Sequence, residues 1–169
     1  DSHFYAHLAL SPDKNSLAWI SWEHPQLPWD GTELRVAKIS IDGVLESCTV
    51  VAGSTTEAVN SPVWANDETL YYLSDKSGFW NIWYISSLGK NRQVLVEAAE
   101  WAHPMWQVGT NLLRILPDGR LVGIHGSPAA EKVAIVDPTS GRVTDCESEL
   151  SNFSHISVHD NQIFAIGGG

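Results

Sequence analysis

The sequence predicts an all-β fold, a partial β-propeller of about three and a half four-stranded antiparallel blades. Apolar residues come in short alternating runs bounded by Gly, Pro, Asn, Asp and Ser, which is typical of half-buried strands. Helical periodicity is nearly absent. One order of strands and turns recurs at intervals of about 40 to 50 residues, the usual rhythm of propeller blades.

The first half of each predicted blade is a strand, a tight turn and a second strand. The turns contain Pro12-Asp13, Asn66-Asp67, Pro117-Asp118-Gly119 and Asp160-Asn161. Asp and Asn suit such turns because their side chains accept backbone N–H groups. The second strands open at Leu17, Leu70, Leu121 and Ile163, so the intervals are 53, 51 and 42 residues.

The second half of each predicted blade adds a third strand and an outer fourth strand. We expect third strands at 33–39, 79–85 and 132–137, and outer strands at 43–52, 92–98 and 142–148. The predicted blades therefore span about 6–54, 58–99 and 111–149, with a half blade at 154–169. A β-sandwich or an irregular β-fold is the alternative, but neither repeats this order of turns and links.

The number of blades predicts exposed sheet faces. A ring that stops after three and a half blades has bare apolar faces at both ends, and its last blade lacks outer strands. We therefore expect the isolated segment to dimerise through these faces or to exchange strands with a second copy.

The composition excludes some partners. The net charge is −10 and no basic run of five or more occurs, so neither nucleic acid nor an anionic membrane surface is an expected partner. No apolar run reaches the roughly 18 residues of a membrane span. The two cysteines, Cys48 and Cys146, form no CxxC motif and fall in different predicted blades, so we expect no disulfide and a cytoplasmic location.

The main candidate site is the unusually long link at residues 22–32, between the second and third strands of the first blade. Its candidate contact residues are Glu23, His24, Trp29, Asp30 and Glu33. Pro25 and Pro28 stiffen the link, and we expect Asp30 to accept N–H groups from the residues that follow it. Either Trp29 folds back as a plug of a compact loop, or the loop protrudes and contacts a partner domain or substrate.

Trp80 and Asn81 are weaker candidates. The segment 74–81 predicts a turn in which Asp75 accepts backbone N–H groups and Asn81 ties the next strand. The alternative is that Trp80 or Asn81 faces a substrate chamber. Alternation within 79–85 places Trp80 and Ile82 on one face and Trp83 on the other, as in a strand covered by a neighbouring blade on each side.

No catalytic residue, metal site or cofactor is expected in this chain. The pairs His3/His7 and His155/His159 have a helical metal-binding spacing, but on strands four residues span about 13 Å, too far for two ligands of one ion. Ser, His and acidic residues all occur, but no Gly-x-Ser-x-Gly nucleophile elbow is present.

The run "SPDKNSLAWISWEHPQLPWDGTEL" resembles the propeller of the prolyl oligopeptidase superfamily, in its dipeptidyl-aminopeptidase/acylaminoacyl-peptidase branch. Further resemblances follow in the same order at "SPVWANDETLYYLSDKSGFWNIWYI", "AEWAHPMWQVG", "LPDGRLVGI" and "VDPTSGRV", so nearly the whole chain is covered. The segment from Trp22 to Leu34 is the most specific, whereas the Ser-Pro-Asp and Pro-Asp-Gly turns occur in many propellers.

The resemblance implies a non-catalytic propeller segment of a serine peptidase. Its partners would be peptide substrates and a catalytic α/β-hydrolase domain of the same parent chain, which is absent from this sequence. The propeller would gate access and help select short peptides. The start at Asp1 and the final "IGGG" also look like cuts inside something larger. The alternative is a non-enzymatic propeller that serves as a scaffold for protein or ligand binding.

Overall fold

A computed structural model describes residues 2–86 and 89–169, and every regular element within them is a β-strand. The first sheet contains β1 (Phe4–Leu10), β2 (Ser16–Trp22), β3 (Glu33–Ile39) and β4 (Leu45–Gly53). The second contains β5 (Val59–Trp64), β6 (Leu70–Ser74), β7 (Asn81–Ile85) and β8 (Asn91–Gln93). The third contains β9 (Leu113–Ile115), β10 (Leu121–Ser127), β11 (Ala130–Val136) and β12 (Val143–Asp145), and the last pairs β13 (Asn152–His159) with β14 (Gln162–Gly168).

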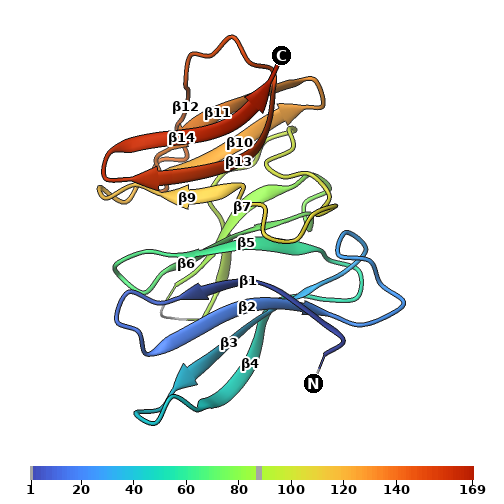
Figure 1. Ribbon diagram of the computed structural model, residues 1–169, viewed down its shortest axis with the longest axis vertical. Helices are drawn as coiled ribbons and strands as arrows, with labels where there is room; N and C mark the ends of the chain where they lie inside the picture. The colour runs from blue at the N-terminus through green and yellow to red at the C-terminus, as the bar shows by residue number, and fades with distance from the viewer. Residues whose placement is uncertain (1, 87–88) are drawn as a thin grey trace.

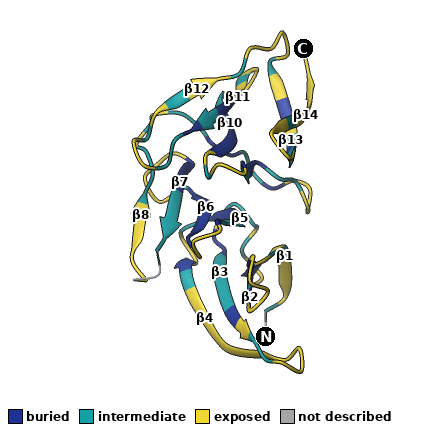
Figure 2. Ribbon diagram, turned by 90° about the vertical axis from the view of Figure 1, so that its left-hand side faces the viewer, coloured by how far each residue is buried: buried dark blue, intermediate teal, exposed yellow. Residues whose placement is uncertain are grey.

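Each sheet is an antiparallel meander in which neighbours in sequence are neighbours in space. The sheets stack face to face from the N-terminus to the C-terminus (Figure 1). In the view turned by 90° from that of Figure 1, the sheets form an arc. The outer strands β4, β8 and β12 lie on one side of this arc and the first strands lie on the other (Figure 2). This arrangement confirms the predicted partial propeller of three blades and a half blade.

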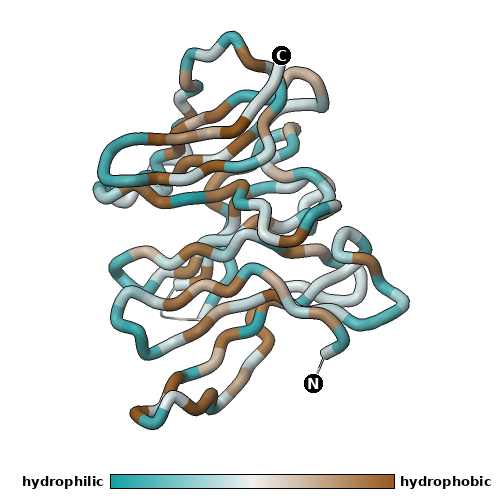
Figure 3. Tube along the Cα trace, viewed as in Figure 1, coloured by the Kyte–Doolittle hydropathy of each residue, from teal (hydrophilic) through white to brown (hydrophobic). Residues whose placement is uncertain are grey.

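The two ends of the strands form two different faces of the arc. The turn face carries the β1–β2 turn and its counterparts, at 11–15, 65–69, 116–120 and 160–161 (Figure 1, left). The loop face carries the β2–β3 loop at 23–32, the β6–β7 loop at 75–80 and the links between blades at 54–58, 94–112 and 146–151. Hydrophilic residues gather in the β1–β2 turn and its counterparts, and hydrophobic residues follow the strands (Figure 3).

The same hydrogen bond closes the β1–β2 turn and its counterparts in the next two blades. The carboxylate of Asp13 accepts the N–H group of the residue two positions later, and so do those of Asp67 and Asp118, at 3.0 to 3.1 Å. The intervening residue has a positive φ in each turn, and in the third it is Gly119, at 88°. Glycine adopts this conformation without the strain of a side chain, which explains the Pro-Asp-Gly form of the motif.

The outer strands of the second and third blades are shorter than the sequence predicts. β8 ends at Gln93, whereas we expected the strand to continue to 98. Val94 and Leu95 instead pack against the core, and the N–H group of Val94 donates to the carbonyl of Ile82 at 2.9 Å. This bond continues the register of β7 and β8 by one residue pair, to Val94 and not to 98.

The cores lie between blades and not within them. One cluster joins the first two blades, with Ile20, Leu34 and Tyr72 among its buried members. A larger cluster joins the second, third and half blades through residues such as Ile82, Leu121 and Ile156. None of the described segments is a helix that is long and apolar enough to cross a membrane.

The second blade shows how one sheet serves two cores. Trp80, Ile82 and Tyr84 belong to the larger cluster, whereas Trp83 and Ile85 pack against the smaller one. The predicted alternation of these faces is therefore confirmed. Because each face of the sheet contacts a different neighbour, both must be apolar.

The two terminal blades keep one face open. On the first blade, Tyr5 and Leu10 are about half exposed. On the half blade, Phe164 and Ile166 are 51% and 64% exposed, and β14 has no further strand paired to its outer edge in the described chain. These surfaces are the physical basis for the expected self-association, which stays a prediction.

Thr32 ties the first blade to the second. Its hydroxyl donates to the carbonyl of Val59 at 2.8 Å and accepts the N–H group of the same residue at 2.7 Å. The Thr32 N–H group also donates to the carbonyl of Glu57 at 3.1 Å. Because Thr32 is only 1% exposed, water cannot replace these bonds. The "WDGTEL" stretch therefore contains a structural residue whose role requires the neighbouring blade.

We expect Thr32→Val to destabilise the fold by about 1–3 kcal/mol, because the change keeps the shape but leaves two buried backbone groups unpaired. Urea unfolding of the purified chain measures this. Thr144→Val, on exposed strand β12, is the matched control and should change stability by less than about 0.5 kcal/mol. Equal losses in the two variants would contradict the role of Thr32.

Candidate functional site

The long loop 23–32 folds on itself through two consecutive turns. The Gln26 N–H group donates to the carbonyl of Glu23, and the Asp30 N–H group donates to the carbonyl of Leu27, each at 2.9 Å. The carboxylate of Asp30 accepts the N–H group of Leu27 at 2.9 Å. The expectation that it accepts from the residues after it was therefore wrong: the acid closes the turn that precedes it.

The start of the chain holds the beginning of this loop. Nδ1 of His3 lies 2.7 Å from the carboxylate of Glu23 and 3.2 Å from the backbone nitrogen of His24. Glu23 and His24 are both exposed, so their contact with His3 contributes little to stability. Both side chains remain accessible on the loop face.

Trp29 contacts a second loop of the same chain. Its ring centroid lies 4.2 Å from that of Trp106, at an interplanar angle of 45°. Trp106 belongs to the link 94–112 and is 73% exposed, whereas Trp29 is half-buried. The tryptophan therefore bridges two loops from different blades and does not plug its own loop alone. We call Trp29 and Trp106 the aromatic bridge.

Glu33 lies apart from the loop tip. It is the first residue of β3, and its carboxylate accepts a hydrogen bond from the guanidinium of Arg35. Nε of Arg35 also donates to the hydroxyl of Ser21 at 2.9 Å. The structure thus places Glu23, His24, Trp29 and Asp30 in one loop, and Glu33 in a strand-borne ion pair.

Trp80 and Asn81 are buried and connect β7 with the link that follows the second blade. The side-chain amide of Asn81 donates to the carbonyl of Glu97 at 3.1 Å and accepts the N–H group of that residue at 3.2 Å. The Trp80 N–H group donates to the carboxylate of Glu100 at 2.9 Å. These bonds match the expected tie by Asn81 and give both residues a structural role.

Asp75 binds outside its own turn. Its carboxylate accepts the N–H group of Ala58, on the link from the first blade, at 2.9 Å. Burial raises the pKa of Asp75 above its usual range, and the nearby charge of Glu57 adds to that rise. We predicted that Asp75 accepts backbone N–H groups, but the donor comes from the preceding blade link, which the local sequence cannot reveal.

A histidine between two carboxylates was missed at the sequence level. Nε2 of His125 lies 2.9 Å from Asp145, and its Nδ1 lies 3.6 Å from Glu97. The ring stacks on Trp101 at 4.5 Å, and Trp101 donates to Glu97 at 2.8 Å. No hydroxyl group of the described residues is hydrogen-bonded to His125, so this cluster lacks the nucleophile of a Ser-His-Asp triad.

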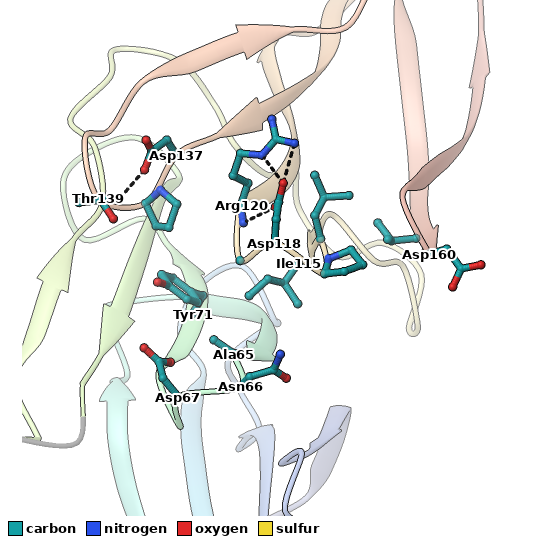
Figure 4. A pocket seen from close by; sticks show the side chains of 15 residues that line it. Ala65, Asn66, Asp67, Tyr71, Ile115, Asp118, Arg120, Asp137, Thr139 and Asp160 are labelled. Carbon is teal, nitrogen blue, oxygen red and sulfur yellow. Dashed lines mark hydrogen bonds and ion pairs between the residues drawn. The ribbon is translucent and has the colours of Figure 1, made fainter.

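A cavity of about 750 Å³ lies on the turn face. It is bordered by turns of the second, third and half blades, including those of Asp67, Asp118, Asp137 and Asp160 (Figure 4). Asp118 pairs with Arg120 at 2.7 Å, and Asp137 accepts the N–H group of Thr139 at 2.8 Å. Asp67, Asp118 and Asp137 thus accept backbone N–H groups that close their own turns, so these acids at the cavity have a structural role.

The described residues contain no group of three or more His, Cys, Asp or Glu side chains arranged to hold a metal ion. Cys48 and Cys146 are both free thiols, one exposed and one half-buried. Burial raises the pKa of the Cys146 thiol, so its reactive thiolate form is disfavoured.

The aromatic bridge can be tested by a double-mutant cycle. We expect Trp29→Ala and Trp106→Ala to be non-additive by about 0.5–1.5 kcal/mol in urea unfolding, because each removes the same ring contact. Phe79→Ala is the control partner, since Phe79 is 40% exposed and forms no ring pair with Trp29. Additive losses for Trp29 and Trp106 would show that the contact contributes nothing.

Comparison with solved structures shows which proteins share this arrangement. A puromycin-hydrolyzing peptidase from Mycobacterium tuberculosis matches all of the chain at 34% identity and a TM-score of 0.93. A puromycin hydrolase matches 98% of the chain at 28% identity and a TM-score of 0.92. Prolyl oligopeptidase B from Galerina marginata matches 96% at 14% identity and a TM-score of 0.71, which shows the fold alone.

The chain covers 26%, 25% and 22% of these three proteins. No protein-family model and no curated protein matches the sequence. The two puromycin-hydrolyzing enzymes share sequence with the chain as well as backbone geometry. With the blade order, these likenesses show that the chain is a partial β-propeller, similar in sequence and fold to part of two puromycin-hydrolyzing enzymes and similar in fold to part of a prolyl oligopeptidase.

Proposed function

We propose that the chain is the non-catalytic propeller segment of a serine peptidase, which gates access to a separate α/β-hydrolase domain. The observation that carries this proposal is the match of the whole chain, at 34% identity, to about a quarter of a peptidase. The segment would act by excluding folded proteins and admitting short peptides.

The proposed gating has a steric basis. The sheets pack face to face through buried apolar clusters, so a blade cannot move without exposing its core to water. Such a wall excludes objects by size. The reacting groups would come from the other domain, because the sequence contains no Gly-x-Ser-x-Gly elbow.

We assign the loop face to contact with the hydrolase domain or the substrate. Its links are long, and it exposes Glu23, His24, Asp30 and the rim of the aromatic bridge, whereas the other face consists of tight turns. Loops on a rigid scaffold are common sites of recognition. The proposed reaction is removal of dipeptides or acyl-amino acids from peptide N-termini through a serine acyl-enzyme. A cytoplasmic location stays a prediction.

The test is the size dependence of hydrolysis by the full-length protein. One cleavable sequence is presented as a short peptide, in an unfolded long chain and in an exposed loop of a folded protein. We expect kcat/KM to fall with size and to vanish for the folded protein, because the propeller excludes it. Comparable kcat/KM values for the short peptide and the folded protein would contradict gating.

A further inference from the structure

A polar cavity of about 310 Å³ lies where the first strands of three blades meet. Its lining comes from His7–Leu10 of β1, Ser61–Trp64 of β5, and Asn111 and Arg114 at β9. These strands form the inner wall of the arc, opposite the outer strands β4, β8 and β12 (Figure 2). The cavity therefore opens on the surface that a substrate passing along the propeller axis would meet.

Arg114 brings an unpaired positive charge to this wall. It is half-buried, and its guanidinium donates to the carbonyl of the adjacent Leu113 at 3.2 Å. No Asp or Glu of the described residues lies within 4.0 Å of it, although the whole chain has 20 such residues. By contrast, Arg35 pairs with Glu33 and Arg120 with Asp118. A partly desolvated cation without a counter-ion favours binding of an anion.

His7 adds a neutral N–H donor. Its Nδ1 accepts the N–H group of Ser61 at 2.8 Å, so the proton of the neutral ring is on Nε2. Nε2 is buried and has no hydrogen-bond partner among the described groups. Burial and then the charge of Arg114 lower the pKa of His7 to about 4, so the ring is neutral at pH 7.

The backbone is distorted at the same place in both neighbouring strands. β1 shifts register between Ala6 and Ala9, and β5 shifts between Asn60 and Val63. His7 and Ser61, inside these bulges, have φ values of 53° and 48°. Non-glycine residues in this region of backbone conformation are strained. β-Bulges redirect side chains and often lie beside binding sites. Here the two bulges interrupt the regular pairing of β1 with β2 and of β5 with β6, at the cavity that Arg114 also lines.

We propose that this inner-wall cavity binds the carboxylate group of a peptide through the guanidinium of Arg114. A planar guanidinium can donate two parallel hydrogen bonds to a carboxylate, which gives both charge and geometry for recognition. The volume suits one residue of a peptide and not a long segment. The carboxylate belongs either to the C-terminus of the peptide or to a Glu or Asp side chain. The inference rests on the proposed function only in taking a peptide as the ligand.

The test is isothermal titration calorimetry of the full-length protein with two pairs of acetylated tripeptides. One pair is acetyl-Gly-Gly-Glu-amide and acetyl-Gly-Gly-Gln-amide; the other is acetyl-Gly-Gly-Ala with a free and with an amidated C-terminus. We expect the carboxylate member of one pair to bind about tenfold or more tightly than its neutral counterpart, as for a charge-assisted hydrogen bond in a partly buried site. The pair that shows the preference identifies the source of the carboxylate.

Arg114→Gln should remove this preference and leave binding of the neutral peptides unchanged, whereas Arg114→Lys should keep part of it. Arg120→Gln is the matched control, because it removes a positive charge from the turn face and should preserve the preference. Equal binding within both pairs overturns the inference, as does an equal loss in Arg120→Gln and Arg114→Gln. The comparison of the two peptides of each pair uses the wild-type protein alone, so it tests the inference even where a variant does not fold.

The same preparations separate this inference from the proposed function. Hydrolysis of neutral peptides by Arg120→Gln should equal that of the wild type, because Arg120 pairs with Asp118 on the turn face and does not line the inner-wall cavity. A protein that binds carboxylate peptides but hydrolyses none contradicts the proposed function and supports the cavity. A protein that hydrolyses peptides without any carboxylate preference contradicts the cavity alone.

Discussion

Packing between neighbouring sheets is the interaction on which the rest of this structure depends. A four-stranded blade has two apolar faces and cannot bury either of them by itself. Tyr72 and Leu73, adjacent on β6, are both fully buried because they face different neighbouring blades. Each such side chain contributes about 1.5–3 kcal/mol on burial, whereas exposed ion pairs contribute about 1 kcal/mol or less. The seams between blades therefore dominate stability.

Several polar groups form hydrogen bonds across those seams or to the links between blades. Thr32 joins the first two blades, Asn81 and Glu100 hold the link after the second, and Ile156 donates to the carbonyl of Asn111 at 2.8 Å between the third and half blades. The side chains that have no role in these contacts between blades indicate candidate binding surfaces. Among the described residues, Arg114 on the inner wall has no carboxylate partner, and Nε2 of His7 has no hydrogen-bond partner. The aromatic bridge stands on the loop face, where two links meet.

The sequence predicted those features that depend only on the local pattern of residues. Strand order, the Asp-containing turns and the two faces of 79–85 follow from alternation and turn chemistry, and all three are present. Contacts between distant segments could not be predicted. The partner of Trp29 lies 77 positions away at Trp106, and the donor to Asp75 is Ala58. The alternation of residues 92–98 also did not reveal that β8 ends at Gln93.

The proposed function requires that this chain shapes access to a peptidase site and does not itself cleave peptides. The most direct measurement is release of nitroaniline from aminoacyl-nitroanilides by the purified chain of residues 1–169, with the full-length protein as the positive control. We predict no release by the chain above that of buffer. Release that scales with the concentration of the chain would contradict it.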